Sequence, residues 1–165
     1  MTQTIKMLSQ RLRQYWLIGQ MALLLFVVRM TMLWMRLPFL LGWLHVIRVS
    51  SVKDFQTLKD VAYYTDRLLA IFPVNERGNC LPRSLVLYGF AKRYGFPVRF
   101  HCGVRWVEQE LTGHAWLTLE GEAFLEPNRQ WEYFDVTYSF PQSSKSESHT
   151  QNRIKKHGDV TSCVS

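Results

Sequence analysis

The sequence predicts an α+β domain in which helices come first and an antiparallel sheet follows. Up to about residue 94, apolar residues recur at steps of three and four, which is typical of helices. From residue 98 onward, apolar and polar residues alternate, which is typical of strands with one buried face. The 165 residues are 47% hydrophobic and 14% aromatic, enough for one compact core, so we expect neither a multi-domain enzyme nor a disordered chain.

Residues 1–45 are predicted to form a basic, apolar helical segment. Uncharged residues run from Tyr15 to Val28, a shorter stretch than the roughly 18 to 20 residues that cross a bilayer. No small-x-small cleavage site follows, which argues against a secretory signal. Arg29 and Arg36 fall on nearly the same side of the helix, so its remaining surface is expected to dock on the domain, on a partner protein or on a membrane. Pro38 is expected to end or kink this helix.

The net charge of +7 lies at the two ends of the chain. Residues 1–45 hold five basic and no acidic residues, residues 46–140 hold eleven of each sign, and residues 141–165 hold four basic and two acidic residues. A nucleic-acid-binding domain concentrates basic residues on its folded face. The neutral middle segment therefore argues against nucleic acid as a partner.

Two further helices are predicted before the sheet. The first covers residues 55–71 and ends before Phe72-Pro73, with Ser51 as N-cap and Asp54 as the acid of a capping box. The second covers about residues 80–94 and follows Asn79, which is a good helix cap.

Four strands complete the predicted domain, which we place at residues 46–140. A turn is expected at residues 120–122, and strands at residues 98–106, 114–119, 123–126 and 134–140. Residues 141–165 contain six serines and scattered charges, and are predicted to form a disordered polar tail.

The three cysteines, Cys80, Cys102 and Cys163, are expected to be free thiols. An odd number in a chain without a convincing export signal favours a reducing, cytoplasmic compartment. Cys102 lies on the apolar side of its predicted strand and is expected to be buried, whereas Cys163 lies in the tail. Cys80 begins a helix, where unpaired N–H groups and the helix dipole stabilise a thiolate, so it is the candidate nucleophile.

His114 is the candidate base for this nucleophile. Attack of a thiol on an amide requires a group with a pKa near 7 that takes the thiol proton and returns it to the leaving amine, and imidazole fits. His114 opens a predicted strand, and the acidic residue Glu126 follows on the neighbouring one. A carboxylate at the second ring nitrogen would fix the tautomer and stabilise the imidazolium.

The chain order of a helix-borne cysteine, a strand-borne histidine and a strand-borne acid resembles that of transglutaminase-like and papain-like cysteine enzymes. Between about residues 75 and 126, short motifs narrow the resemblance to the lasso-peptide maturation proteases of the transglutaminase-like superfamily, the B-two type. These motifs are Asn79-Cys80-Leu81-Pro82-Arg83-Ser84-Leu85, Leu87-Tyr88, Arg93-Tyr94-Gly95, Gly103-Val104-Arg105 and Gly113-His114-Ala115-Trp116.

The resemblance implies a leader peptidase in which Cys80 is the nucleophile, His114 the general base and acid, and Glu126 the orienting group. The family more commonly has Asp at the last position, so Glu120 and Asp135 remain alternatives. The substrate would be a ribosomally made precursor peptide, delivered by a separate leader-binding protein. After cleavage, an ATP-using, asparagine-synthetase-like cyclase would close the macrolactam.

Two residues near this set are candidate supports. Arg83, one helical turn after Cys80, is expected to steady the thiolate, to bind a substrate carboxylate or to form a surface salt bridge. Trp116 is expected to pack in the core or to line a substrate cleft. No cofactor or metal is expected, because His101 and Cys102 are strand neighbours that point to opposite faces, so one zinc ion cannot readily take both.

Two rival functions remain open. A transglutaminase-like acyltransferase or deamidase would use the same residues, since these reactions pass through a thioester that either an amine or water resolves. A non-catalytic interaction protein at a membrane surface would use Cys80 and His114 structurally. We expect a cytoplasmic protein, peripheral to the inner face of the membrane if its N-terminal helix docks there.

Overall fold

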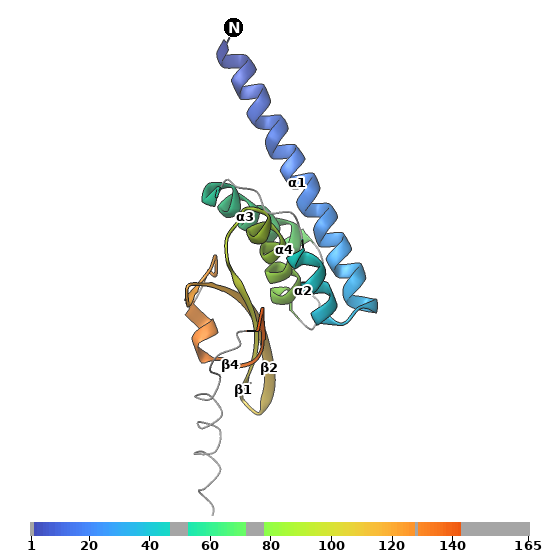
Figure 1. The fold of residues 1–165 in the computed structure, drawn as a ribbon, viewed down its shortest axis with the longest axis vertical. Coiled ribbons are helices and arrows are strands. Elements are labelled where there is room, and N and C mark those ends of the chain that lie inside the picture. Colours follow the sequence, from blue (N-terminus) through green and yellow to red (C-terminus); the bar gives the residue numbers. More distant parts are fainter. Residues whose placement is uncertain (1, 47–52, 72–77, 128, 143–165) are drawn as a thin grey trace, which may run out of the picture.

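The computed structural model describes residues 2–46, 53–71, 78–127 and 129–142, and it confirms the α+β layout (Figure 1). The four helices are α1 (Thr2–Trp34), α2 (Leu37–His45), α3 (Phe55–Ile71) and α4 (Cys80–Arg93). The four strands are β1 (Arg99–Val107), β2 (Glu110–Leu119), β3 (Glu122–Ala123) and β4 (Asp135–Phe140). A short 3-10 helix, η1 (Arg129–Tyr133), precedes β4. The helix α4 packs against the other three helices and against β1 and β2.

The break between the first two helices precedes Pro38. The helix α1 ends at Trp34, and Pro38 lies in the first turn of α2, where a missing N–H removes no helical hydrogen bond. Pro38 therefore starts the second helix, whereas the sequence had predicted that it ends or kinks the first. In the described part of the chain, Arg11–Trp34 is long and apolar enough to cross a membrane by length and composition alone.

The helix α3 is capped by Asp54. The Asp54 carboxylate accepts hydrogen bonds from the backbone N–H of Thr57, at 3.0 Å, and from the Thr57 hydroxyl. Asp54 is thus the N-cap itself. The prediction that it is the acid of a capping box is wrong. Ser51, the predicted cap, lies outside the described residues.

Asn79 links three helices but does not cap α4 with its side chain, which corrects the prediction. Its amide oxygen accepts a hydrogen bond from the Arg29 guanidinium in α1 at 3.0 Å. Its amide N–H donates to the Leu69 carbonyl in α3 at 3.5 Å. The residue that precedes Cys80 is therefore held by the first and third helices.

The sheet has the strand order β3-β2-β1-β4, and each neighbouring pair is antiparallel. The strands β1 and β2 form a long hairpin that pairs Gly103 with His114. The strand β2 begins at Glu110, before the predicted start, because residues 108–109 adopt positive φ and form a two-residue turn without the usual Asn or Gly. The strand β3 contains only two residues, Glu122 and Ala123, and Glu126 lies beyond it. The prediction that Glu126 lies on a strand is therefore wrong.

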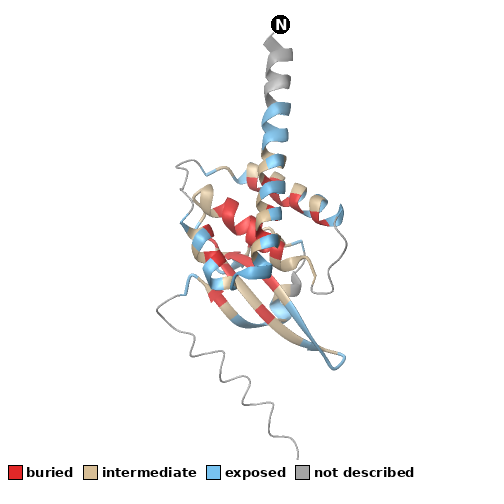
Figure 2. Cartoon of the chain, turned by 90° about the vertical axis from the view of Figure 1, so that its right-hand side faces the viewer, coloured by how far each residue is buried: buried red, intermediate tan, exposed pale blue. Residues whose placement is uncertain are grey.

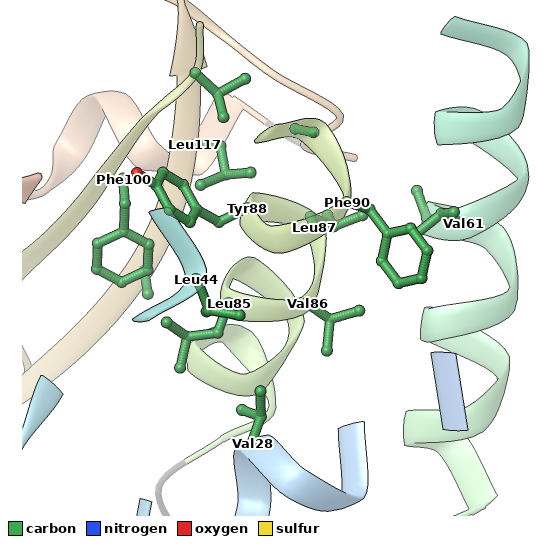
Figure 3. Packing of buried hydrophobic residues seen from close by; sticks show 14 of the residues in the cluster. Val28, Leu44, Val61, Leu85, Val86, Leu87, Tyr88, Phe90, Phe100 and Leu117 are labelled. Atoms are coloured by element: carbon green, nitrogen blue, oxygen red, sulfur yellow. The ribbon is translucent and has the colours of Figure 1, made fainter. Parts of the chain in front are cut away.

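One hydrophobic core joins the helices to the sheet (Figure 3). The helix α4 lies at its centre, and the side chains of residues 85–88 are fully buried because helices cover one side of α4 and the sheet covers the other. The core also takes residues from the N-terminal helices, namely Met21, Leu25, Val28, Leu40, Leu41 and Leu44. The predicted division into residues 1–45 and 46–140 stays a prediction, and residues 143–165 of the predicted tail lie outside the described residues.

Gly103 provides a test of the packing under the site. It is buried at an irregular point between β1 and β4, and a Cβ there would lie 2.8 Å from the Asp135 carbonyl oxygen and 2.9 Å from the Trp116 ring. We expect Gly103→Ala to lower the free energy of unfolding by about 1–3 kcal/mol, because backbone or a buried ring must move. Chemical denaturation followed by circular dichroism measures this change.

Gly113→Ala is the matched control on the neighbouring strand. A Cβ there has its nearest contact at 3.9 Å, with the Gly103 carbonyl oxygen, which is an ordinary van der Waals distance. We expect this variant to change stability by less than about 0.5 kcal/mol. Equal destabilisation by the two substitutions would contradict the proposed steric cause.

Candidate active site

Cys80 is the first residue of α4 and is partly buried. Gly78 precedes it with a φ of +74°, a left-handed conformation that favours glycine, and provides the turn into the helix. The backbone groups of Leu81, in the first turn of α4, and of Ala115, in β2, hydrogen bond to the Cys80 sulfur. N–H groups aimed at a sulfur at a helix N-terminus stabilise the thiolate.

The ionisation of Cys80 is coupled to that of His114. Burial raises the pKa of the Cys80 thiol, but hydrogen bonds from His114 and the backbone, together with the histidine charge, outweigh it and lower the pKa from 9.0. Hydrogen bonds to Cys80 and Glu126 raise the pKa of His114 to about 9, against the opposing effect of burial. The two shifts have one origin, because a thiolate and an imidazolium in contact stabilise each other. The contact therefore shifts the pair toward the thiolate and the imidazolium.

Glu126 is the acid that faces this histidine. Its Oε2 lies 3.7 Å from Nε2 of His114, and its side chain is only 6% exposed. Leu125, which precedes it, has a φ of +56°, an uncommon conformation for a residue with a side chain. The other two candidates for the orienting acid are exposed. Glu120 lies in the turn between β2 and β3, and Asp135 lies at the start of β4.

Arg83 holds the segment that carries Glu126. Its Nη1 lies 3.2 Å from the Glu126 carboxylate, and its Nη2 donates to the Leu125 carbonyl at 2.8 Å. On its other side, Nε and Nη2 donate to the Asp66 carboxylate in α3 at 2.6 and 3.3 Å. The Arg83 side chain is 12% exposed, so it forms a largely buried bridge. The predicted contacts with a thiolate or a substrate carboxylate stay predictions.

Trp116 is buried between two histidines. Its ring stacks on His101, with centroids 5.6 Å apart, and on His114, with centroids 5.8 Å apart. Trp131 of η1 and Phe134 lie beside it, and the Phe134 ring centroid is 5.2 Å from that of His114. This packing restricts the orientation of the imidazole. The sequence did not single out Trp131 and Phe134, because η1 has no periodicity and Phe134 had been assigned to the fourth strand.

His101 and Cys102 have separate surroundings. The two ring nitrogens of His101 lie 2.8 Å from the Ser139 hydroxyl and 2.9 Å from the Thr118 hydroxyl, and burial lowers the pKa of His101 to about 4. Burial raises the pKa of Cys102 to about 12. Within the described residues, no group of three or more His, Cys, Asp or Glu side chains is placed to hold a metal ion. Cys163 lies outside these residues.

Alkylation by iodoacetamide tests the state of Cys80. The lowered pKa of Cys80 raises its thiolate fraction at pH 7, whereas a pKa of about 12 leaves Cys102 with a thiolate fraction on the order of 10⁻⁵. We therefore expect Cys80 to react much faster than Cys102, as measured by peptide mass mapping of timed samples. In His114→Ala the Cys80 rate at pH 7 should fall, because the thiol loses the hydrogen bond and the charge that lower its pKa against the effect of burial. An unchanged rate in this variant would contradict the coupling.

The same assay tests the bridge made by Arg83. In Arg83→Met, the Glu126 carboxylate loses its partner, and the support that it gives to the His114 imidazolium weakens. We expect the alkylation rate of Cys80 at pH 7 to fall about threefold to tenfold. Asp66→Asn is the control, since Asp66 is half exposed on the far side of the guanidinium, and its effect should be smaller. Circular dichroism establishes that each variant is folded, and equal rates in the wild type and a folded Arg83→Met would oppose the role of the bridge.

Comparison with known proteins places this arrangement in a family. The model of the transglutaminase-like superfamily matches residues 23–139, which include Cys80, His114 and Glu126. The comparisons with curated proteins and with solved structures found no significant match. The match covers more than half of the chain and extends from the buried part of α1 through β4. The chain therefore belongs to the transglutaminase-like superfamily, which includes cysteine peptidases.

Proposed function

We propose that this protein is a cysteine peptidase that removes the leader from a ribosomally made lasso-peptide precursor. The observation that carries the peptidase assignment is the contact of Cys80 with His114, which also faces Glu126, at the N-terminus of α4. The substrate assignment rests on the resemblance of the motifs around Cys80 and His114 to the lasso-peptide maturation proteases.

In the proposed reaction, the Cys80 thiolate attacks the carbonyl carbon of the scissile amide. The His114 imidazolium gives its proton to the leaving amine, and an acyl thioester remains on Cys80. His114 then takes a proton from water, which attacks the thioester and releases the carboxylate product. Glu126 stabilises the imidazolium through both steps, and Arg83 positions Glu126 by its hydrogen bonds to residues 125 and 126.

The pKa shifts define the pH range of this reaction. Protonation of the thiolate removes the nucleophile below the lowered pKa of Cys80. Loss of the imidazolium proton removes the acid above the raised pKa of His114, about 9. Activity is therefore expected to be bell-shaped, with an alkaline limb near pH 9.

The proposed partners follow the resemblance. We assign leader recognition to a separate leader-binding protein, as the resemblance to the lasso-peptide maturation proteases implies. The leader-free peptide would pass to an asparagine-synthetase-like cyclase. The odd number of cysteines supports a reducing, cytoplasmic compartment, and the neutral middle of the chain gives no reason to include nucleic acid.

Mass spectrometry of a precursor cleavage assay tests the proposal. The full chain is incubated with a leader-bearing precursor and its leader-binding protein, and the expected products are free leader and free core peptide. Cys80→Ala should reduce the rate by several orders of magnitude, because it removes the nucleophile. Cys102→Ser, which changes a thiol outside the proposed mechanism, should retain activity.

Other outcomes identify the rival functions. If added primary amines are joined to the new carboxyl end, the thioester is resolved by acyl transfer. Equal cleavage by wild type and Cys80→Ala would contradict the thiol mechanism. Intact precursor in every sample, with Cys80 alkylated normally, would oppose the lasso substrate but leave the reactive cysteine in place.

A further inference from the structure

The outer face of α1 is apolar along most of the described helix. Met21, Leu25 and Val28 face the core and are at most 2% exposed. On the opposite side, exposed apolar residues follow one another at helical spacing, and in Figure 2 exposed residues (pale blue) recur along α1. We call them the α1 outer face: Leu12, Trp16, Leu23, Phe26, Met30 and Leu33, which are 46% to 74% exposed.

This face continues onto α2. Phe39, Trp43 and Val46 are 71%, 54% and 83% exposed. Trp43 and Leu23 line the same hollow of about 240 Å³, which lies between α1, α2 and α4. The two helices therefore present one apolar surface rather than isolated side chains, and a surface of this extent marks an interaction site.

The basic residues beside this face indicate what kind of surface it binds. Residues 1–45 contain five basic residues and no acidic ones. Arg11 and Arg13, both exposed, flank Leu12 at about 100° on each side of the helix, where long basic side chains can reach past an apolar layer to anionic groups. Two copies of α1 packed together would bring like charges together, which disfavours a second copy. Aromatic side chains between flanking arginines are typical of helices at a lipid–water interface.

The packing of α1 determines how it can meet a membrane. Its core side is covered by protein from Met21 to Val28, and Arg29 is hydrogen bonded to Asn79. Lipid can surround this part of α1 only if the helix separates from α3 and α4. A spanning orientation therefore requires disruption of the core, whereas an orientation parallel to the membrane plane leaves every described contact intact.

We propose that the α1 outer face, together with Phe39 and Trp43 of α2 and with Val46, which follows α2, binds the surface of a membrane that contains anionic lipid. The helix α1 lies parallel to that surface, with its apolar side chains in the interface and its arginines at the lipid phosphates. The sheet, which lies on the other side of α4, faces away from the lipid (Figure 1). This inference is independent of the proposed peptidase reaction.

Vesicle flotation of the full chain tests the proposal. We expect the protein to float with vesicles of phosphatidylcholine and phosphatidylglycerol, to float less with phosphatidylcholine alone, and to be released in part by high salt. The triple variant Leu12→Ser, Trp16→Ser, Phe26→Ser should bind the anionic vesicles at least about tenfold more weakly. The double variant Arg11→Glu, Arg13→Glu should bind anionic vesicles more weakly than the wild type does, and should bind vesicles of phosphatidylcholine as the wild type does.

Trp106 and Leu111 provide the matched control. They are 74% and 57% exposed on facing strands of the β1–β2 hairpin, away from α1. Trp106→Ser with Leu111→Ser should bind vesicles as the wild type does. Circular dichroism of each variant establishes that it is folded.

Three results would overturn the proposal. The first is the absence of flotation with anionic vesicles. The second is equal flotation of the triple variant and the wild type. The third is association through this face with protein and not with vesicles. A dimer, or a complex with the leader-binding protein, that forms in the wild type and is lost in the triple variant would then assign the face to a protein partner.

Discussion

The contact between the first turn of α4 and the strand β2 positions the proposed catalytic groups. Cys80 contacts His114 and the Ala115 backbone, and Ser84, just after this turn, donates to the Ala115 carbonyl at 2.8 Å. Between them, Arg83 reaches the Glu126 segment, which follows β2 in the chain. Ser84 is fully buried, so its hydrogen bond fixes the distance between helix and strand where water cannot compete. The sulfur and the imidazole meet because this contact is formed.

Arginine suits position 83 better than lysine would, because the position requires hydrogen bonds to several acceptors at once. A buried carboxylate such as Glu126 is unfavourable unless paired, and the planar guanidinium pairs it while donating to the Leu125 carbonyl and to Asp66. One side chain thus satisfies three acceptors from two separate segments. The uncommon backbone conformation of Leu125 is held by one of these bonds, so the carboxylate is positioned without a strand beneath it.

Local patterns predict the fold class, and they single out two of the three residues that meet at the candidate site. Cys80 was recognisable from its place at a helix start, and His114 from its place on an alternating strand. Glu126 was named, but its expected strand ends at Ala123, and only the fold distinguishes it from Glu120 and Asp135.

The contacts that the sequence did not reveal join residues that are distant in the chain. Arg29 meets Asn79 across 50 positions, and Arg83 meets Asp66 across 17. No periodicity encodes such pairs, since each depends on how whole helices pack. For the same reason, the sequence predicts Asn79 as a cap from its local position, whereas in the fold its side chain bonds to Arg29 and to the Leu69 carbonyl.

The Arg29–Asn79 hydrogen bond sets a limit on how this protein can be shortened or fused. A fragment that begins at residue 46 would lose Met21, Leu25 and Val28 from the core, and the residue before Cys80 would lose a partner. Residues 1–45 are therefore not a detachable leader sequence for a smaller enzyme. An added module, such as a fused recognition domain, would leave these contacts intact if it were joined ahead of Arg11, because residues 11–16 are exposed.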